Sequence, residues 1–151
     1  MKRISNTCII LLGCTFIVSG FSKIINVDAF ASEIAQYAEY YLSNEIIRWR
    51  TYAAICVCIL EIIMGILAVF RRSKIIITIT SIFFFAAMCF FLYLTGMNYF
   101  NPPIEGSIES CGCFGELIHF TAQTSFYKSL FLWVVSAINL LIRLRFNECK
   151  T

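Results

Sequence analysis

Residues 51–70 read TYAAICVCILEIIMGILAVF, and the class of fold follows from this run. It is apolar over a length that crosses a bilayer as a helix, and it carries a single acidic residue, Glu61. The basic turn RRSK follows at residues 71–74, and a second apolar run covers residues 75–95. Because backbone groups in lipid must be paired within the protein, both runs are predicted to be transmembrane helices joined by a tight turn.

Two more apolar runs lie at residues 8–25 and 126–144. The 151 residues are 60% hydrophobic and 14% charged, with a mean hydropathy of +0.81, whereas soluble domains carry about 25% charged residues. No repeat or linker divides the chain. We therefore predict an all-α protein, a bundle of four transmembrane helices formed by one integral membrane domain over residues 1–151.

The first run has an alternative interpretation as a cleavable signal peptide, because Val18-Ser19-Gly20 resembles a small-residue cleavage site. The apolar run continues past Gly20 to Ile25, which favours a span. Residues 26–50 are polar, but aromatic and aliphatic side chains recur there at helical spacing. They are Phe30, Ile34, Tyr37 and Tyr41, and they predict a short amphipathic helix at the membrane surface.

The basic residues indicate the orientation. The larger group falls at the two ends of the chain and in the turn 71–74, and the smaller group falls in or beside the two long loops. The first group is Lys2, Arg3, Arg71, Arg72, Lys74, Arg143, Arg145 and Lys150; the second is Lys23, Arg48, Arg50 and Lys128. The positive-inside rule then places both termini in the cytoplasm and both long loops, with the amphipathic helix, outside it. Membrane orientation explains the basic clusters, so no nucleic-acid partner is predicted.

The second long loop contains Ser-Cys-Gly-Cys-Phe-Gly-Glu at residues 110–116. A disulfide between Cys111 and Cys113 would close a very small ring, and strained disulfides are easily reduced. Gly112 is the residue type that best tolerates the backbone angles of such a ring. The sequence therefore predicts a redox-active pair that exchanges disulfides with a partner, in an oxidising compartment.

Two alternatives for these thiols remain open. Either cysteine could instead form a structural disulfide with Cys56 or Cys58, near the outer end of the second span. The pair could also bind metal together with His119, but Zn²⁺ prefers four ligands, so no metal is predicted. The cysteines within the spans are interpreted as small hydrophobic residues: Cys8, Cys14, Cys56, Cys58 and Cys89.

Three polar residues of the predicted spans are candidate supporting groups for a polar pocket: Glu61, Lys23 and Ser19. A charge near the middle of a span is costly, so Glu61 is either neutral and bonded to a neighbouring helix or part of a proton-relay or quinone contact. Lys23, taken alone, is expected to extend its ammonium group outward to the interface.

The sequence resembles the MauE/DoxX family of redox-associated membrane proteins. The resemblance rests on Ser19-Gly20-Phe21-Ser22-Lys23, on Leu60-Glu61 with Gly65, and on Cys111-Gly112-Cys113-Phe114-Gly115 before the last span. It implies a four-helix membrane bundle that works beside extracytoplasmic thioredoxin-like proteins in maturing disulfide-bearing partners. Within the family, MauE is associated with maturation of a dehydrogenase light subunit, and DoxX-like relatives with quinone-linked sulfur oxidation.

The favoured hypothesis is therefore a thiol–disulfide exchange partner in the cell membrane, with a quinone as a candidate electron acceptor. Cys56 and Cys58 are the only candidates for a second thiol pair, but residues two apart on a helix face different ways. A second hypothesis is a non-catalytic scaffold or accessory subunit that needs the loops but not the thiols. A small-solute carrier is the weakest, because the chain shows no duplicated halves or broken helices.

Overall fold

The computed structural model describes residues 2–41, 45–70, 73–102 and 121–148. Within these ranges every regular element is a helix, so the all-α prediction is confirmed. The elements are α1 (Lys2–Ile25), α2 (Val27–Tyr41), α3 (Glu45–Arg48), α4 (Arg50–Phe70), α5 (Lys74–Phe100) and α6 (Ala122–Glu148).

Four of these helices are long and apolar enough to cross a membrane, which confirms the four predicted spans. They are Ser5–Ile25, Arg50–Phe70, Lys74–Phe100 and Ala122–Arg145. Helices α1, α5 and α6 extend beyond the predicted spans, because they continue past the apolar runs into polar and aromatic residues. The chain is thus a multi-pass membrane protein embedded in a lipid bilayer.

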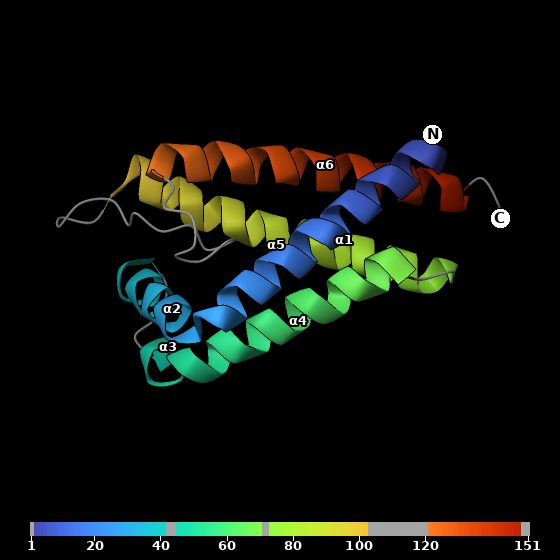
Figure 1. The fold of residues 1–151 in the computed structure, drawn as a ribbon. Coiled ribbons are helices and arrows are strands. Elements are labelled where there is room, and N and C mark those ends of the chain that lie inside the picture. Colours follow the sequence, from blue (N-terminus) through green and yellow to red (C-terminus); the bar gives the residue numbers. More distant parts are fainter. Residues whose placement is uncertain (1, 42–44, 71–72, 103–120, 149–151) are drawn as a thin grey trace.

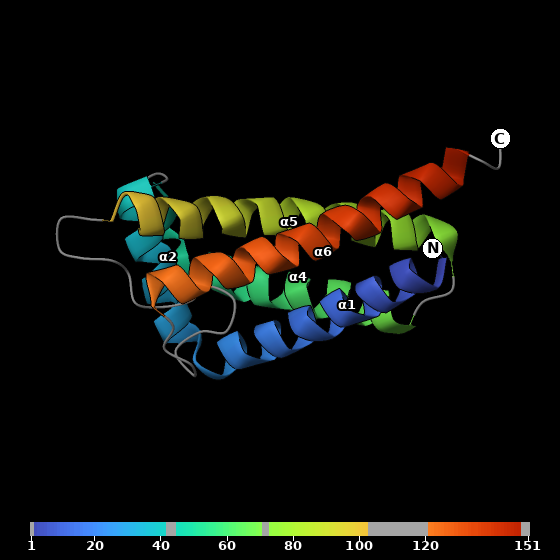
Figure 2. The ribbon, with the colours of Figure 1, turned by 90° about the horizontal axis from the view of Figure 1, so that it is seen from above.

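The four long helices run alternately up and down (Figures 1 and 2). The start of α1, the end of α4, the start of α5 and the end of α6 lie at one end of the bundle, while α2 and α3 lie at the other. Helix α1 packs mainly on α4, and α5 packs mainly on α6. Of the basic residues that the sequence grouped together, those in the described helices therefore lie at the same end of the molecule: Lys2, Arg3, Lys74, Arg143 and Arg145.

The helices pack along buried stripes that repeat every three and four residues. The stripe on α1 is Ser5, Ile9, Leu12, Phe16, Ser19 and Lys23. The stripe on α4 is Ala54, Cys58, Glu61, Gly65 and Ala68. A spacing of about 3.5 residues is the one that keeps side chains on the seam of a left-handed bundle. Two charged residues, Lys23 and Glu61, therefore occupy positions that the packing directs inward.

Glycines bring α1 and α4 into close contact. A Cβ atom added to Gly65 would lie 2.7 Å from the backbone oxygen of Gly13 and 2.6 Å from Cγ1 of Ile17. A Cβ added to Gly20 would lie 3.0 Å from the backbone oxygen of Cys58. Small residues at helix crossings allow backbones in a membrane to approach in this way. The approach places the side chains of α1 within direct reach of Glu61.

A polar seam, formed on α6 by Ser125, Ser129, Ser136 and Asn139, faces the interior of the bundle. The Asn139 amide joins three helices, because its nitrogen donates to Ser81 Oγ at 2.9 Å and its oxygen accepts from Ser5 Oγ at 2.8 Å. These side chains come from α6, α5 and α1. Hydrogen bonds between helices thus supplement apolar packing at the end of the bundle that carries the termini.

Replacing Asn139 with leucine should lower the free energy of unfolding by about 1–2 kcal/mol, since interhelical hydrogen bonds in membranes average roughly 0.6 kcal/mol each and the hydroxyls of Ser5 and Ser81 lose their shared partner. Reversible unfolding in mixed detergent micelles would measure the loss. The matched control is Ser136→Ala, because Ser136 Oγ donates to the Trp133 carbonyl of its own helix. An equal loss in both variants would contradict a role for the three-helix contact.

The amphipathic helix predicted between the first two spans is confirmed as α2. It buries Phe30, Ala31, Tyr37 and Ala38. Phe30 and Ala31 pack with Ala54 and Cys58 of α4. Helix α2 therefore covers the end of the bundle beside α1 and α4 and contributes to its core.

Candidate functional site

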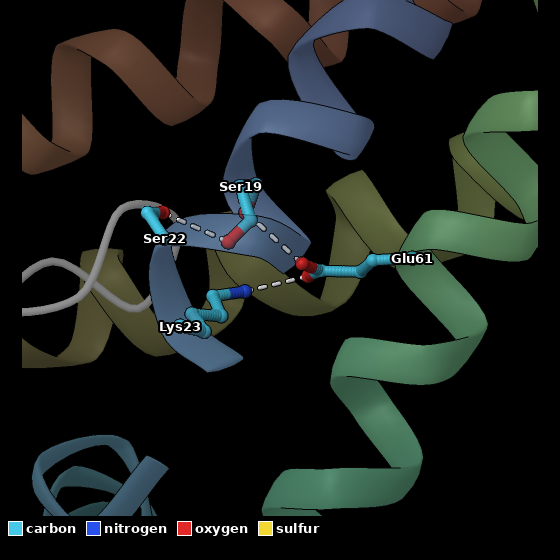
Figure 3. Close-up of polar contacts among 4 residues, drawn as sticks. All are labelled: Ser19, Ser22, Lys23 and Glu61. Carbon is cyan, nitrogen blue, oxygen red and sulfur yellow. Dashed lines mark hydrogen bonds and ion pairs between the residues drawn. The ribbon is translucent and has the colours of Figure 1, made fainter. Parts of the chain in front are cut away.

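A buried ion pair joins α1 to α4. Lys23 Nζ lies 2.6 Å from Glu61 Oε1, and Ser19 Oγ donates a hydrogen bond of 3.0 Å to Glu61 Oε2 (Figure 3). Lys23 is 0% exposed and Glu61 is 3% exposed. The sequence predicted that Ser19, Lys23 and Glu61 support a polar pocket, and the structure brings all three side chains together.

The predicted outward extension of Lys23 is wrong. Lys23 stands four residues after Ser19 on the buried stripe of α1, so its side chain is directed toward α4. Glu61 accepts hydrogen bonds from both residues of the neighbouring helix as part of an ion pair, whereas the sequence suggested a neutral side chain that donates to that helix. The position of Lys23 in the last turn of α1 also suits a cation, because the carbonyl end of a helix is partly negative.

Aromatic rings surround the rest of the ammonium group. Lys23 Nζ lies 4.7 Å from the centroid of the Phe30 ring on α2 and 5.1 Å from that of the Phe91 ring on α5. Ring faces attract cations electrostatically, and more strongly when water is excluded. The ion pair is therefore held by contacts from four helices: α1, α2, α4 and α5.

An apolar cavity of about 310 Å³ lies beside the ion pair, with Glu61 in its wall. Its lining comes from α1, α2, α4 and α5 and is rich in phenylalanine. The lining residues are Phe16, Phe30, Glu33, Ile34, Tyr37, Ala53, Val57, Leu60, Glu61, Phe83, Ala87, Phe90, Phe91, Leu94 and Thr95. Leu60 and Phe90 are each 48% exposed, so the lining continues to the outer surface of α4 and α5.

The sequence reasoning missed Glu33 as a site residue. Its side chain is only 4% exposed and lines the cavity from α2. The available signal was its position three residues after Phe30 and four before Tyr37, which places a carboxyl group on the apolar face of an amphipathic helix. Such a residue is more informative than an acid on the solvent face, because burial of a carboxyl group is costly.

The predicted redox pair Cys111 and Cys113, with Gly112 between them, lies outside the described residues, as does His119. Cys56 and Cys58 are free thiols; Cys56 is exposed and Cys58 is buried, so they face different ways as expected. Within the described ranges, no group of three or more histidine, cysteine or acidic side chains lies close enough to hold a metal ion.

Together, the fold and the site define a class: a four-span α-helical membrane protein with a buried ion pair beside an apolar cavity. The sequence model of the family described as methylamine utilisation protein MauE matches residues 1–142. The match covers nearly the whole chain, and this protein therefore belongs to the MauE family. Comparisons with curated proteins and with solved structures found no match.

Proposed function

We propose that this MauE-family protein takes part in extracytoplasmic thiol–disulfide exchange, exchanging through Cys111 and Cys113 during the maturation of exported, disulfide-containing proteins. The observation that carries the proposal is the Cys-Gly-Cys sequence between α5 and α6. Helix α5 ends, and α6 begins, at the end of the bundle that also carries α2 (Figure 1). By the positive-inside rule this end faces outward and both termini face the cytoplasm.

The exchange has two steps. A thiolate of the partner attacks one sulfur of the Cys111–Cys113 disulfide, which forms a mixed disulfide and releases the other cysteine as a thiolate. The second thiol of the partner then attacks the mixed disulfide. The partner leaves oxidised, and Cys111 and Cys113 are left as two thiols. A protein with a thioredoxin-like dithiol supplies the required pair of sulfurs.

The ion pair serves this function as a positioning element. Helix α1 is joined to α4 by the contacts of Glu61 with Lys23 and Ser19. The contacts of Lys23 with the rings of Phe30 and Phe91 connect α2 and α5 to the same cluster. Helix α5 leads directly into the segment that carries the thiols. The cluster therefore fixes the scaffold from which the Cys-Gly-Cys loop is presented to a partner.

Single Cys111→Ser and Cys113→Ser variants test the exchange. Each variant leaves a single cysteine of the pair, which can attack the disulfide of an oxidised thioredoxin-fold protein in the reverse of the exchange described above. Because the neighbouring cysteine that would resolve the mixed disulfide is missing, the mixed disulfide should be trapped, visible as a reductant-sensitive band after acid quenching and alkylation. The Cys56→Ser variant, which changes an exposed thiol of α4, should behave as wild type. If neither single variant traps a partner or alters the disulfide status of exported proteins, the exchange function is refuted.

The orientation has its own test. A membrane-impermeant thiol reagent should label Cys111 and Cys113 in intact cells after reduction, whereas Cys149 should react only once the membrane is opened. Variants that retain one of these sites at a time make the two signals separable. The reverse pattern would show that the loop faces the cytoplasm.

The family description, methylamine utilisation protein, favours a second candidate. In this alternative the protein is a non-catalytic scaffold for the processing or transport of a partner such as a dehydrogenase light subunit. The scaffold would depend on the ion pair and the loops, but not on the thiols. Full partner maturation in a Cys111→Ser/Cys113→Ser double variant would support the scaffold and exclude exchange.

A further inference from the structure

We propose that the cavity between α1, α2, α4 and α5 binds one acyl chain of a diacyl phospholipid, and that the phosphate of the same lipid lies at headgroup level beside Arg50. The lipid belongs to the leaflet on the side of the membrane that carries α2. The inference goes beyond thiol exchange and does not depend on it. It rests on the wall, the opening and the shape of the cavity, and on a basic residue beyond its end.

The wall of the cavity is apolar. The four polar side chains of the lining are each 5% exposed or less: Glu33, Tyr37, Glu61 and Thr95. The carboxylate of Glu61 is already bonded to Lys23 and Ser19, and the Thr95 hydroxyl donates to the Phe91 carbonyl at 2.8 Å. A buried water molecule needs about two to four polar partners, so this wall favours hydrocarbon over water.

The bilayer supplies that hydrocarbon. The lining residues belong to α2 and to three of the helices that are long and apolar enough to span a membrane. An empty cavity deprives the side chains around it of contact atoms and is therefore destabilising. Acyl chains make up the core of the bilayer that surrounds these helices. A lipid chain is thus the apolar occupant that is always at hand.

The cavity opens toward the lipid between α4 and α5. Helix α4 packs mainly on α1, and α5 packs mainly on α6. The two helices diverge toward the end of the bundle that carries α2 (Figure 1). Leu60 of α4 and Phe90 of α5 both line the cavity, and each is 48% exposed. An acyl chain can therefore enter sideways from the bilayer without crossing a polar surface.

The cavity is elongated. Its lining runs along α4 from Ala53 to Glu61 and along α5 from Phe83 to Thr95. At about 1.5 Å per residue, the segment of α5 alone is roughly 18 Å long. A cavity of about 150 Å³ holds one benzene molecule, so the 310 Å³ found here is about twice that volume, distributed along the helices. A narrow apolar space of this length suits an unbranched chain better than a compact ring.

A basic residue lies beyond the outer end of the cavity. Arg50 is the first residue of α4, and three lining residues follow it at helical spacing on the same face: Ala53, Val57 and Leu60. Helical side chains are tilted toward the N-terminus, which carries the guanidinium group of Arg50 toward the membrane surface. Arg50 is exposed and forms no ion pair with any residue that the structure describes. Its paired N–H donors match the geometry of a phosphate group.

Aromatic residues mark the headgroup level at this point of the chain. Trp49 and Tyr52 are 58% and 68% exposed, and their ring centroids lie 5.8 Å apart. Tryptophan and tyrosine are enriched where the membrane meets water. Arg50 lies between them in the sequence and is therefore at the depth of the lipid phosphates. A single lipid can thus place its phosphate beside Arg50 and one of its chains in the cavity.

Binding is to be measured on the full-length protein, stripped of lipid in detergent micelles, by native mass spectrometry. The three probes are a phosphatidylglycerol, the diacylglycerol with the same two chains, and glycerol 3-phosphate. One phosphatidylglycerol molecule should bind saturably and at least about tenfold more tightly than the diacylglycerol, and glycerol 3-phosphate should not bind. Binding of many equivalent lipids, equal affinity for the diacylglycerol, or binding of glycerol 3-phosphate as tight as that of the lipid would each overturn the proposal.

A matched pair of variants on α5 locates the chain. Ala87→Phe fills the cavity and should weaken binding of phosphatidylglycerol at least about tenfold. Ala86→Phe places the same ring on the exposed side of α5 and should leave binding unchanged. Helical circular dichroism checks that both variants are folded. Equal affinities of the two variants would show that the chain lies elsewhere.

A second pair of variants locates the phosphate without altering the interior, because both residues are exposed. Arg50→Gln should weaken binding of phosphatidylglycerol about tenfold and leave binding of the diacylglycerol unchanged. Arg48→Gln removes a charge from α3, outside the face of α4 that leads into the cavity, and should have no effect on either probe. An equal change in both variants, or no change in either, would overturn the assignment of the phosphate to Arg50.

Discussion

Replacement of Glu61 with alanine should lower the free energy of unfolding by about 3–5 kcal/mol, because it leaves the Lys23 ammonium buried without its anion. The geometry makes the effect large. Lys23 is completely buried, its distance to Glu61 Oε1 is 2.6 Å, and the aromatic rings of Phe30 and Phe91 lie near its ammonium group. Lys23→Met should cost a similar amount, since the carboxylate then loses its cation.

Combined removal of both charges should recover most of the loss. Buried ion pairs replaced by apolar residues of similar volume are often neutral or stabilising, so a Lys23→Met/Glu61→Leu variant should unfold close to wild type. Reversible unfolding in mixed micelles, followed by helical circular dichroism, gives the double-mutant cycle. Ser19→Ala serves as a milder control with an expected loss of about 1 kcal/mol, because it removes one hydrogen bond to Glu61. A double variant as unstable as the single variants would show that the ion pair is not the source of the effect.

The Gly65→Ala substitution should destabilise the bundle by about 1–3 kcal/mol, the range for overpacking of a tight interior. The new Cβ would meet the Gly13 backbone oxygen at 2.7 Å and the Ile17 side chain at 2.6 Å. A backbone atom cannot rotate away, so α1 and α4 must separate, which also lengthens the contacts of Glu61 with Ser19 and Lys23. Helix association measured by energy transfer between labels on α1 and α4 would report the separation.

The matched control is Gly96→Ala on α5. A Cβ at Gly96 would meet the Phe126 ring at 3.6 Å, an ordinary contact distance. Alanine is favoured over glycine in a helix by up to about 1 kcal/mol, so this variant should be neutral or slightly stabilising. Equal destabilisation at both positions would indicate that the loss of glycine, and not the close approach of α1 to α4, is responsible.

The fold was predictable from the sequence because hydrophobic length is a strong signal. In lipid the apolar runs around Glu61 and after Lys74 had to be helices, whatever the β-branched content of the second. The boundaries were less predictable. Helix α5 continues to Phe100, and its C-terminal residues include Gly96, Asn98 and Tyr99, which hydropathy alone does not assign to an apolar run.

The candidate site was only partly predictable. Ser19, Lys23 and Glu61 stood out as polar residues within spans, but one-dimensional sequence does not show which residue faces which across a helix crossing. The prediction that Lys23 extends outward failed for this reason. Lys23 belongs to the buried face of α1, and that face can be recognised only when the packing of α1 against α4 is known. Glu33 and the cavity depend on how α2 folds back on α4, which is a tertiary effect.

The polar seam on α6 has a consequence for biogenesis. Four polar residues of this helix are buried inside the bundle, and they lower its hydrophobicity: Ser125, Ser129, Ser136 and Asn139. Partitioning from the translocon into lipid depends on the summed hydrophobicity of a segment. Asn139 of α6 forms hydrogen bonds with Ser5 of α1 and Ser81 of α5. Helix α6 is synthesised after α1 and α5. Its stable integration therefore draws on helices that are already inserted, and membrane entry of the last span becomes coupled to assembly.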